Sequence, residues 1–239
     1  MAKTKQQRAN EKLFEAVESF DDDAFHKALR SGADVNALDE DSFSPLFSAV
    51  YNLQVPMIEA LIEAGADVNL SGLDGWTPLH EAARGGNASI VQMLLDAGAS
   101  MTSFCIGHSE LVGGYPIHEA SGDAVLLLVN HGADVEAKDE KGRVPLHYRA
   151  GSGDAVSIRL LLEAGANPYP LDDEGRSPLD YADPKSRHEK DVSNALRAVA
   201  AERDRLALAA STPLAARSES SVERCASCGR PAHPGRCRL

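Results

Sequence analysis

A Gly-Ala dipeptide recurs through the chain at an almost constant interval. It begins at Gly32, Gly65, Gly98, Gly132 and Gly165. Self-similarity at a period of about 33 residues is typical of stacked supersecondary units, none of which can bury its own apolar face alone. The recurrence therefore predicts a repeat architecture in which every unit depends on its neighbours for a core.

A series of tetrapeptides, each with Pro in second place, runs in phase with the dipeptides: Ser44–Phe47, Thr77–His80, Tyr115–His118, Val144–His147 and Ser177–Asp180. Ser and Thr are good N-cap residues, and Pro is well tolerated at the first helical position. Each tetrapeptide therefore predicts the start of a helix. Tyr115 and Val144 lack the capping hydroxyl, so we expect their units to be locally weaker.

The second unit shows the expected order of elements. Thr77 can cap a helix that begins at Pro78, and Gly85 with the glycine after it ends that helix. The segment 88–97 follows, and its apolar residues fall on one helical face: Ile90, Val91, Leu94 and Leu95. Gly98 is a suitable left-handed C-cap for this second helix. Each unit therefore reads as helix, turn, helix and extended loop.

The segment GWTPLHEAARGGN…IVQMLLDAGA, at Gly75 to Ala99, resembles the ankyrin-repeat family. Parts of the same pattern recur in phase with it at Asp34–Asp39, Ala66–Gly75 and Ala133–Gly142. The resemblance covers about Leu13 to Arg197. It implies an all-α solenoid of helix-turn-helix units with β-hairpin-like finger loops, and a chain that binds a protein partner and is not an enzyme.

The pattern divides the chain into four parts. We expect residues 1–10 to be a disordered N-terminus and 11–206 to be the ankyrin-repeat domain, with an N-cap unit and five Pro-bearing units. Residues 207–224 are small, polar and without periodicity, which predicts a flexible linker. Residues 225–239 form a candidate zinc-binding tail.

The third unit departs from the regular spacing. The segment 100–115 is too long for a standard finger, and the stretch from His118 to Gly132 is shorter than the equivalent stretch from His80 to Gly98. We therefore expect an enlarged finger followed by a helix pair that is about one turn shorter. The insertion is either a tolerated change in a surface loop or a dedicated binding loop.

The recurring histidines His80, His118 and His147 occupy the same place in successive units. Units of this kind lie too far apart for these side chains to share a metal ion. Identical placement favours a repeated packing role, and the resemblance implies hydrogen bonds between neighbouring turns.

Partner-binding residues are expected on the concave face and at the bases of the fingers. The candidates precede the tetrapeptide, follow its last residue, or lie one turn later: Phe43, Tyr51, Trp76, Glu81, Arg84, Glu119, Arg143, Tyr148 and Arg176. Exposed Trp, Tyr and Arg side chains dominate the energy of protein interfaces. Trp76 is the strongest candidate, because a fingertip offers it little core to join. Packing within the stack is the alternative for Tyr148.

The tail contains Cys225, Cys228, His233 and Cys237, which together could form a tetrahedral zinc site. The spacing resembles a Cys-Cys-His-Cys zinc knuckle in which one residue is missing before the last cysteine. The alternative is a basic tail whose cysteines are incidental. Apart from this possible zinc ion, we expect no cofactor.

Charge and cysteine usage restrict the compartment and the partners. A formal net charge of −12 opposes nonspecific binding to nucleic acid, which only the arginine-rich tail could contact. The sequence has no apolar segment long enough to cross a membrane and no secretory signal, and its cysteines do not form a distributed disulfide framework. We therefore expect a cytoplasmic monomer with a protein partner.

Three functions fit these observations. The leading hypothesis is a non-catalytic intracellular protein–protein interaction module. The first alternative is an inhibitor or immunity-type protein that neutralises one enzyme. The second is an adaptor whose zinc-binding tail contacts nucleic acid. The chain has no nucleophile elbow, phosphate-binding glycine loop or HExxH motif, so catalysis is the least supported function.

Overall fold

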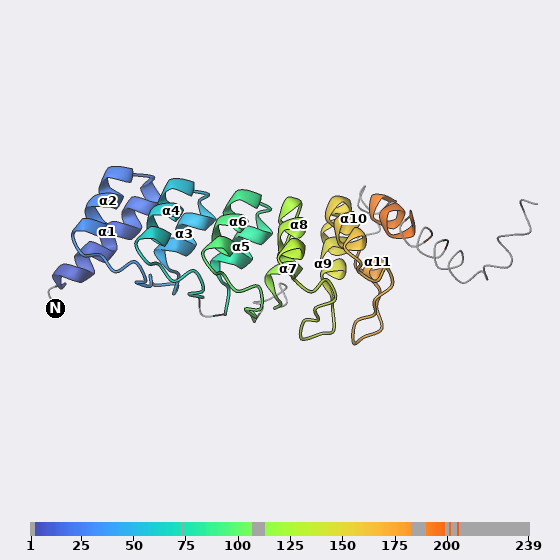
Figure 1. The fold of residues 1–239 in the computed structure, drawn as a ribbon. Coiled ribbons are helices and arrows are strands. Elements are labelled where there is room, and N and C mark those ends of the chain that lie inside the picture. Colours follow the sequence, from blue (N-terminus) through green and yellow to red (C-terminus); the bar gives the residue numbers. More distant parts are fainter. Residues whose placement is uncertain are drawn as a thin grey trace, which may run out of the picture. The chain divides into compact units, whose positions relative to one another are not determined.

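The computed structural model describes residues 3–72, 74–106, 113–182 and 190–198, with 201 and 205. The chain divides into two compact units, Met1–Arg197 and Ala198–Leu239, and the helical hairpins lie in the first. Its helices form a row (Figure 1): α1 Lys5–Ser19, α2 Asp22–Arg30, α3 Pro45–Tyr51, α4 Val55–Glu63, α5 Pro78–Arg84, α6 Ala88–Asp96, α7 Pro116–Glu119, α8 Asp123–Asn130, α9 Pro145–Ser152, α10 Ala155–Glu163 and α11 Pro178–Tyr181.

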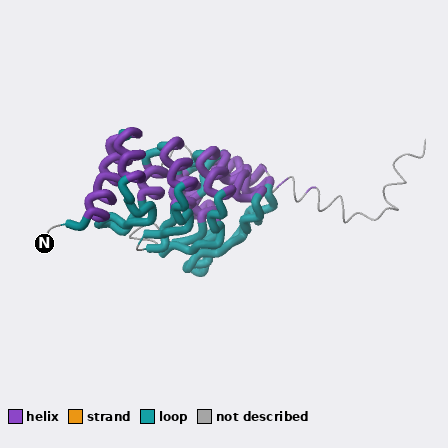
Figure 2. Tube along the Cα trace, turned by 60° about the vertical axis from the view of Figure 1, so that its left-hand side comes forward, coloured by secondary structure: helices purple, strands orange, loops and turns teal. Residues whose placement is uncertain are grey.

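Each hairpin begins where the tetrapeptides predict. Ser44 Oγ accepts the backbone N–H of Phe47 at 3.1 Å, and Thr77 Oγ1 accepts that of His80 at 3.4 Å. Val144 makes no side-chain cap bond, as predicted, because valine has no hydroxyl group. Figure 2 shows the helices along one side of the first unit and the loops along the other.

The core contains two rows of equivalent apolar side chains that run through successive units. The residue after each signature proline is almost completely buried in four successive units: Leu46, Leu79, Ile117 and Leu146. The outer helices contribute a second buried row, made of Leu61, Leu94, Leu128 and Leu161. Since each row continues from unit to unit, burial of one hairpin requires the next.

The N-terminal end differs from the expected boundary. Residues 1–10 were expected to be disordered, but α1 begins at Lys5 and Ala9 is buried. Thr4 and Gln7 form a capping box, in which the Thr4 hydroxyl accepts the Gln7 N–H and the Gln7 side chain accepts the Thr4 N–H. This reciprocal cap starts the helix before the first apolar position.

The fingers are tight loops without a strand in the described part of the chain. In the fourth unit, the Asp139 N–H donates to the Arg143 carbonyl at 3.0 Å, and the first, second and fifth units contain the same closure. Neighbouring loops are joined by side chains. Asn36 Oδ1 accepts the Asp67 N–H at 2.8 Å, and Asn69 Oδ1 accepts the Ser100 N–H at 2.7 Å.

The third unit has the expected short helix pair, and α7 contains only four residues. Its free backbone groups bond to neighbouring units. The Ser121 N–H donates to the Ala83 carbonyl at 3.1 Å, and the Gly122 N–H donates to Ser157 Oγ at 2.8 Å. Residues 107–112 of the enlarged finger lie outside the described residues.

Candidate protein-binding surface

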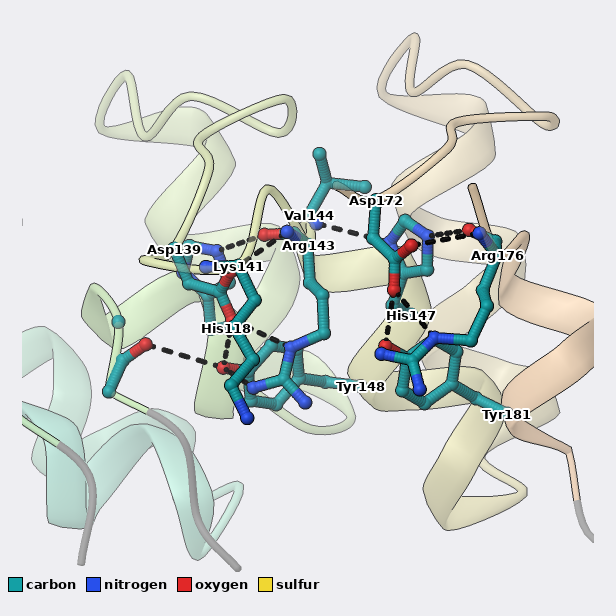
Figure 3. Close-up of polar contacts among 12 residues, drawn as sticks. His118, Asp139, Lys141, Arg143, Val144, His147, Tyr148, Asp172, Arg176 and Tyr181 are labelled. Atoms are coloured by element: carbon teal, nitrogen blue, oxygen red, sulfur yellow. Dashed lines mark hydrogen bonds and ion pairs between the residues drawn. The ribbon is translucent and has the colours of Figure 1, made fainter. Parts of the chain in front are cut away.

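Three buried histidines link neighbouring units by hydrogen bonds. His80 Nδ1 accepts the Thr77 N–H at 3.2 Å, and its Nε2 donates to the Gly114 carbonyl of the next unit at 3.1 Å. His118 and His147 repeat this arrangement, and their Nε2 atoms lie 3.2 Å from carbonyl oxygens in the units that follow them (Figure 3). A neutral ring with its proton on Nε2 satisfies both bonds.

Burial keeps these rings neutral. It lowers the pKa of His80 from 6.5 to about 4, against the opposing effect of the bond to Gly114. Burial also lowers the pKa values of His118 and His147. The histidines therefore have the structural role that their repeated placement predicts.

In the fourth unit, the finger is held to its helix by Asp139, Arg143 and Tyr148. Asp139 Oδ1 accepts the Arg143 N–H at 2.8 Å, and Oδ2 accepts from Arg143 Nε at 2.7 Å and from the Tyr148 hydroxyl at 2.8 Å (Figure 3). The Arg143 guanidinium lies 4.7 Å from the centre of the Tyr148 ring. Burial tends to raise the pKa of Asp139, but these hydrogen bonds outweigh it and lower that pKa.

The fifth unit repeats the same triad. Asp172 Oδ2 accepts from Arg176 Nε at 3.0 Å and from the Tyr181 hydroxyl at 2.6 Å. The centre of the Tyr181 ring lies 4.9 Å from the Arg176 guanidinium and 5.9 Å from that of Arg143 in the preceding unit. In the fourth and fifth units, arginines and tyrosines thus alternate: Arg143, Tyr148, Arg176 and Tyr181 (Figure 3). They lie on the face formed by the short helices α3, α5, α7, α9 and α11, which we call the short-helix face.

The second unit contains a different polar cluster on this face. The Trp76 indole N–H donates to Glu81 Oε2 at 3.3 Å. Arg84 forms a two-point ion pair with the same carboxylate, at 3.2 Å from Nε and 2.6 Å from Nη2. The Trp76 ring also lies 5.2 Å from the His80 ring. The carboxylate of Glu81 therefore receives donors from both the finger and its own helix.

The N-terminal end of the short-helix face carries three aromatic side chains: Tyr51 is exposed, Phe43 is half-buried and Phe47 is buried. Phe43 stacks on Phe47 with ring centres 4.2 Å apart, and Tyr51 is 62% exposed. A groove of about 310 Å³ lies here, lined by Glu18, Phe43, Phe47, Ser48, Tyr51 and Asn52. Exposed aromatic surface beside a carboxylate suits an interface hot spot.

A second groove, of about 480 Å³, lies between α1 and the first finger and also reaches Glu18. Its carboxylates come from both elements, and Phe14 and Leu38 supply apolar surface. No basic side chain lines this groove among the described residues: Gln7, Asn10, Glu11, Phe14, Glu15, Glu18, Leu38, Asp39 and Glu40. We refer to this groove and the aromatic groove together as the N-terminal grooves.

A scan against protein-family models matches residues 13–105 and 117–197 to the family Ankyrin repeats (3 copies). The chain belongs to the ankyrin-repeat family. Ankyrin repeats generally mediate protein–protein interactions, and the family is typically non-catalytic. A search of curated proteins finds no match.

The ankyrin-repeat stack presents some of the expected binding residues on its surface. Tyr51 and Arg84 are exposed, while Phe43, Trp76 and Tyr148 are half-buried and Arg176 keeps 41% of its side chain exposed. Trp76 was expected to lack core contacts, but its indole packs on His80 and bonds to Glu81. The binding role of these residues stays a prediction.

Three of the expected binding residues are largely covered by their surroundings: Glu81, Glu119 and Arg143. Glu81 and Glu119 are buried, and the Arg143 side chain is only 12% exposed. Arg143 is buried because Asp139 and Tyr148 bind its guanidinium on the inner side of the finger. The sequence showed the position of each side chain on its helix but not the depth to which the neighbouring units cover it.

The acidic groove at α1 was not predicted. Its only sequence signal was the series Glu11, Glu15 and Glu18, which has helical spacing within the N-cap unit. The expected zinc ligands Cys225, Cys228, His233 and Cys237 lie outside the described residues. The described residues contain no cluster of potential metal ligands and no helix long and apolar enough to cross a membrane.

Proposed function

We propose that this ankyrin-repeat chain is a non-catalytic cytoplasmic module that binds a protein partner through the short-helix face and the bases of its fingers. The observation that carries this proposal is the pair of N-terminal grooves, which place exposed aromatic surface next to uncompensated carboxylates. Such a surface offers a large apolar contact together with a charge that selects the partner.

Charge favours a partner with a basic contact surface. Glu15, Glu18 and Glu40 line the acidic groove and have no ion pair in the part of the chain that the structure describes. An inhibitor that neutralises an enzyme would use the same surface against a basic target. The adaptor alternative depends on the tail, where a zinc site stays a separate proposal.

Affinity capture with the intact chain tests the proposed face. Tyr51→Ala should weaken capture of the partner from a lysate of the source organism by about 2 kcal/mol, the usual size of an interface hot spot. Tyr169→Ala is the matched control, because Tyr169 is 60% exposed and lines neither N-terminal groove. Equal capture by the wild type and Tyr51→Ala, with loss in Tyr169→Ala, would place the interface elsewhere.

A further inference from the structure

A series of hydrogen bonds joins each finger to the next one along the stack. In each bond, a side-chain oxygen near the start of one finger accepts the backbone N–H of the residue that follows the Gly-Ala dipeptide of the next finger. The acceptor and donor pairs are Asn36 with Asp67, Asn69 with Ser100 and Glu136 with Asn167, at N···O distances of 2.8, 2.7 and 2.7 Å. The bonds thus link the first finger to the second, the second to the third and the fourth to the fifth.

The equivalent bond is missing between the third and fourth fingers. Thr102 stands at the position that Asn69 holds in the second finger, and its side chain is shorter and has no amide. The Thr102 hydroxyl instead lies 3.1 Å from Ser100 Oγ. Among the described residues, neither the Asp134 N–H nor the Gly132 carbonyl makes a hydrogen bond. We call this junction the inter-finger gap.

A pocket of about 450 Å³ lies at the inter-finger gap. Met101, Tyr115 and Ile117 supply apolar surface to it, and Gly132 and Asp134 also line it. Gly132 and Asp134 are exposed, so a molecule in solution can reach their unbonded backbone groups. A pocket of this size, with apolar walls and a few placed polar groups, is typical of a binding site.

The second and third fingers show which chemical group fits this backbone. The Asn69 carboxamide accepts the Ser100 N–H at 2.7 Å and donates to the Gly98 carbonyl at 3.2 Å. Gly98 and Ser100 occupy the same places in their finger as Gly132 and Asp134 in the next. A primary carboxamide presents a C=O and an N–H on the same side, whereas a trans peptide bond directs them to opposite sides. An asparagine side chain therefore matches both free groups.

The charges at the pocket favour a neutral group. Asp134, Glu136 and Lys138 line it and carry both signs, so no single ionic partner is selected. The Glu136 carboxylate already accepts the Asn167 N–H. A carboxamide needs no opposite charge, and asparagine loses less side-chain freedom on binding than the longer glutamine.

We propose that the inter-finger gap binds the carboxamide of an asparagine from a protein partner, which supplies the bond that Thr102 does not make. The Asp134 N–H donates to the amide oxygen, and the Gly132 carbonyl accepts from the amide nitrogen. This site goes beyond the proposed function, because it lies outside the N-terminal grooves and takes a neutral group instead of a basic one.

Thr102→Asn tests the geometry within the chain itself. Its carboxamide should bind Asp134 and Gly132 as Asn69 binds the third finger, and should raise the thermal midpoint by about 2–4 °C. Asn69→Thr should open the preceding junction and lower the midpoint by a similar amount. Thr102→Val is the matched control, because it keeps the shape of threonine and adds no amide. A midpoint of Thr102→Asn no higher than that of Thr102→Val would overturn the geometry.

Peptides from a random phage-displayed library, selected on the intact chain and counter-selected on Thr102→Asn, provide the probe for binding. They should share an asparagine and should bind Thr102→Asn at least about tenfold more weakly than the wild type, because its own side chain fills the gap. Replacing the shared asparagine by alanine should give the same loss, while Thr102→Val should bind as the wild type does. A library without such peptides would overturn the proposal.

Amide NMR of Asp134 tests the contact directly. In the free chain its N–H should exchange quickly with solvent, and peptide binding should slow this exchange and shift the resonance. Slow exchange in the free chain would mean that another acceptor already holds the N–H. An unchanged resonance at saturating peptide would mean that the peptide binds elsewhere, and either result would overturn the asparagine site.

The outcomes also distinguish this site from the proposed function. Tyr51 lines a different groove, so Tyr51→Ala should leave the selected peptides unaffected. If Tyr51→Ala weakens capture of the partner and no peptide responds to Thr102→Asn, the short-helix face stands and the asparagine site falls. If peptides respond to Thr102→Asn and Tyr51→Ala does not change capture, the asparagine site stands and the N-terminal grooves lose their proposed role.

Discussion

At the scale of single residues, the stack depends on buried polar groups that each serve two units. His80 illustrates this, because one ring nitrogen accepts from its own helix start and the other donates to the next unit. A doubly protonated ring cannot accept from the Thr77 N–H. Protonation therefore breaks the contact that begins one helix and strains the junction with the following unit.

Acidification from pH 7 to pH 4 should destabilise the fold. The folded-state pKa of His80 lies at about 4, below its ordinary value of 6.5, so the unfolded chain takes up the proton first. Stability from this group is fully present above about pH 6.5 and is lost as the pH falls towards 4, by up to about 3 kcal/mol. His118 and His147 act in the same direction. Urea unfolding across this pH range measures the slope.

The control for this prediction is His26→Gln, which changes an exposed histidine and should keep the slope. His80→Gln should be less stable at pH 7 and should depend less on pH between 4 and 6.5. Glu119 has a raised folded-state pKa, so its contribution to stability increases as the pH falls, opposite to that of the histidines. The wild type and both histidine variants contain Glu119, so it does not account for a difference between them. Stability that is constant or rises as the pH falls would contradict the role given to the histidines.

At the scale of elements, the third unit survives the loss of a helical turn because its neighbours supply the missing bonds. Ser157 is completely buried on α10. Its hydroxyl accepts the Gly122 N–H at the start of α8 and donates to Asp154, the N-cap of α10. The Ser157 side chain thus bonds both to the backbone at the start of α8 in the shortened unit and to the N-cap residue of α10 in the next unit.

Ser157→Ala should destabilise the protein by about 1–3 kcal/mol, because it leaves the Gly122 N–H and one Asp154 oxygen without their shared partner. Ser152→Ala, at an exposed position on α9, should stay within about 0.5 kcal/mol of the wild type. Chemical denaturation of both variants measures the difference. Equal stability of the two variants would show that the Ser157 bond does not support the third unit.

The sequence predicted those elements that repeat. The caps and glycines of the second unit predicted α5 and α6, and the shortened spacing predicted the short α7. The start of α1 was missed because its capping box, Thr4 with Gln7, precedes the periodic apolar positions. The bond from Gly122 to Ser157 was also beyond prediction, since its partners belong to different units and no single repeat contains them both.

At the scale of the whole molecule, the sequence predicted which residues lie on the short-helix face. It did not predict how deeply each of them is buried or where carboxylates gather into a groove. Position in the repeat placed Tyr51 and Arg84 on the surface correctly, because a helical turn fixes which side a residue faces. The burial of Glu119 depends on the side chains of adjoining units, which a single repeat does not contain. The acidic groove likewise arises between α1 and a finger that follows α2 in the sequence, so no continuous segment of the chain contains it.

The most direct test of the account is hydrogen–deuterium exchange of the intact chain with and without its captured partner. The account predicts slower exchange in the fingers and short helices of the first two Pro-bearing units, at residues 39–51 and 74–84, while the outer helices α4 and α6 are unchanged. Protection confined to α4, α6 and α10, with the short helices unaffected, would contradict the proposed binding face.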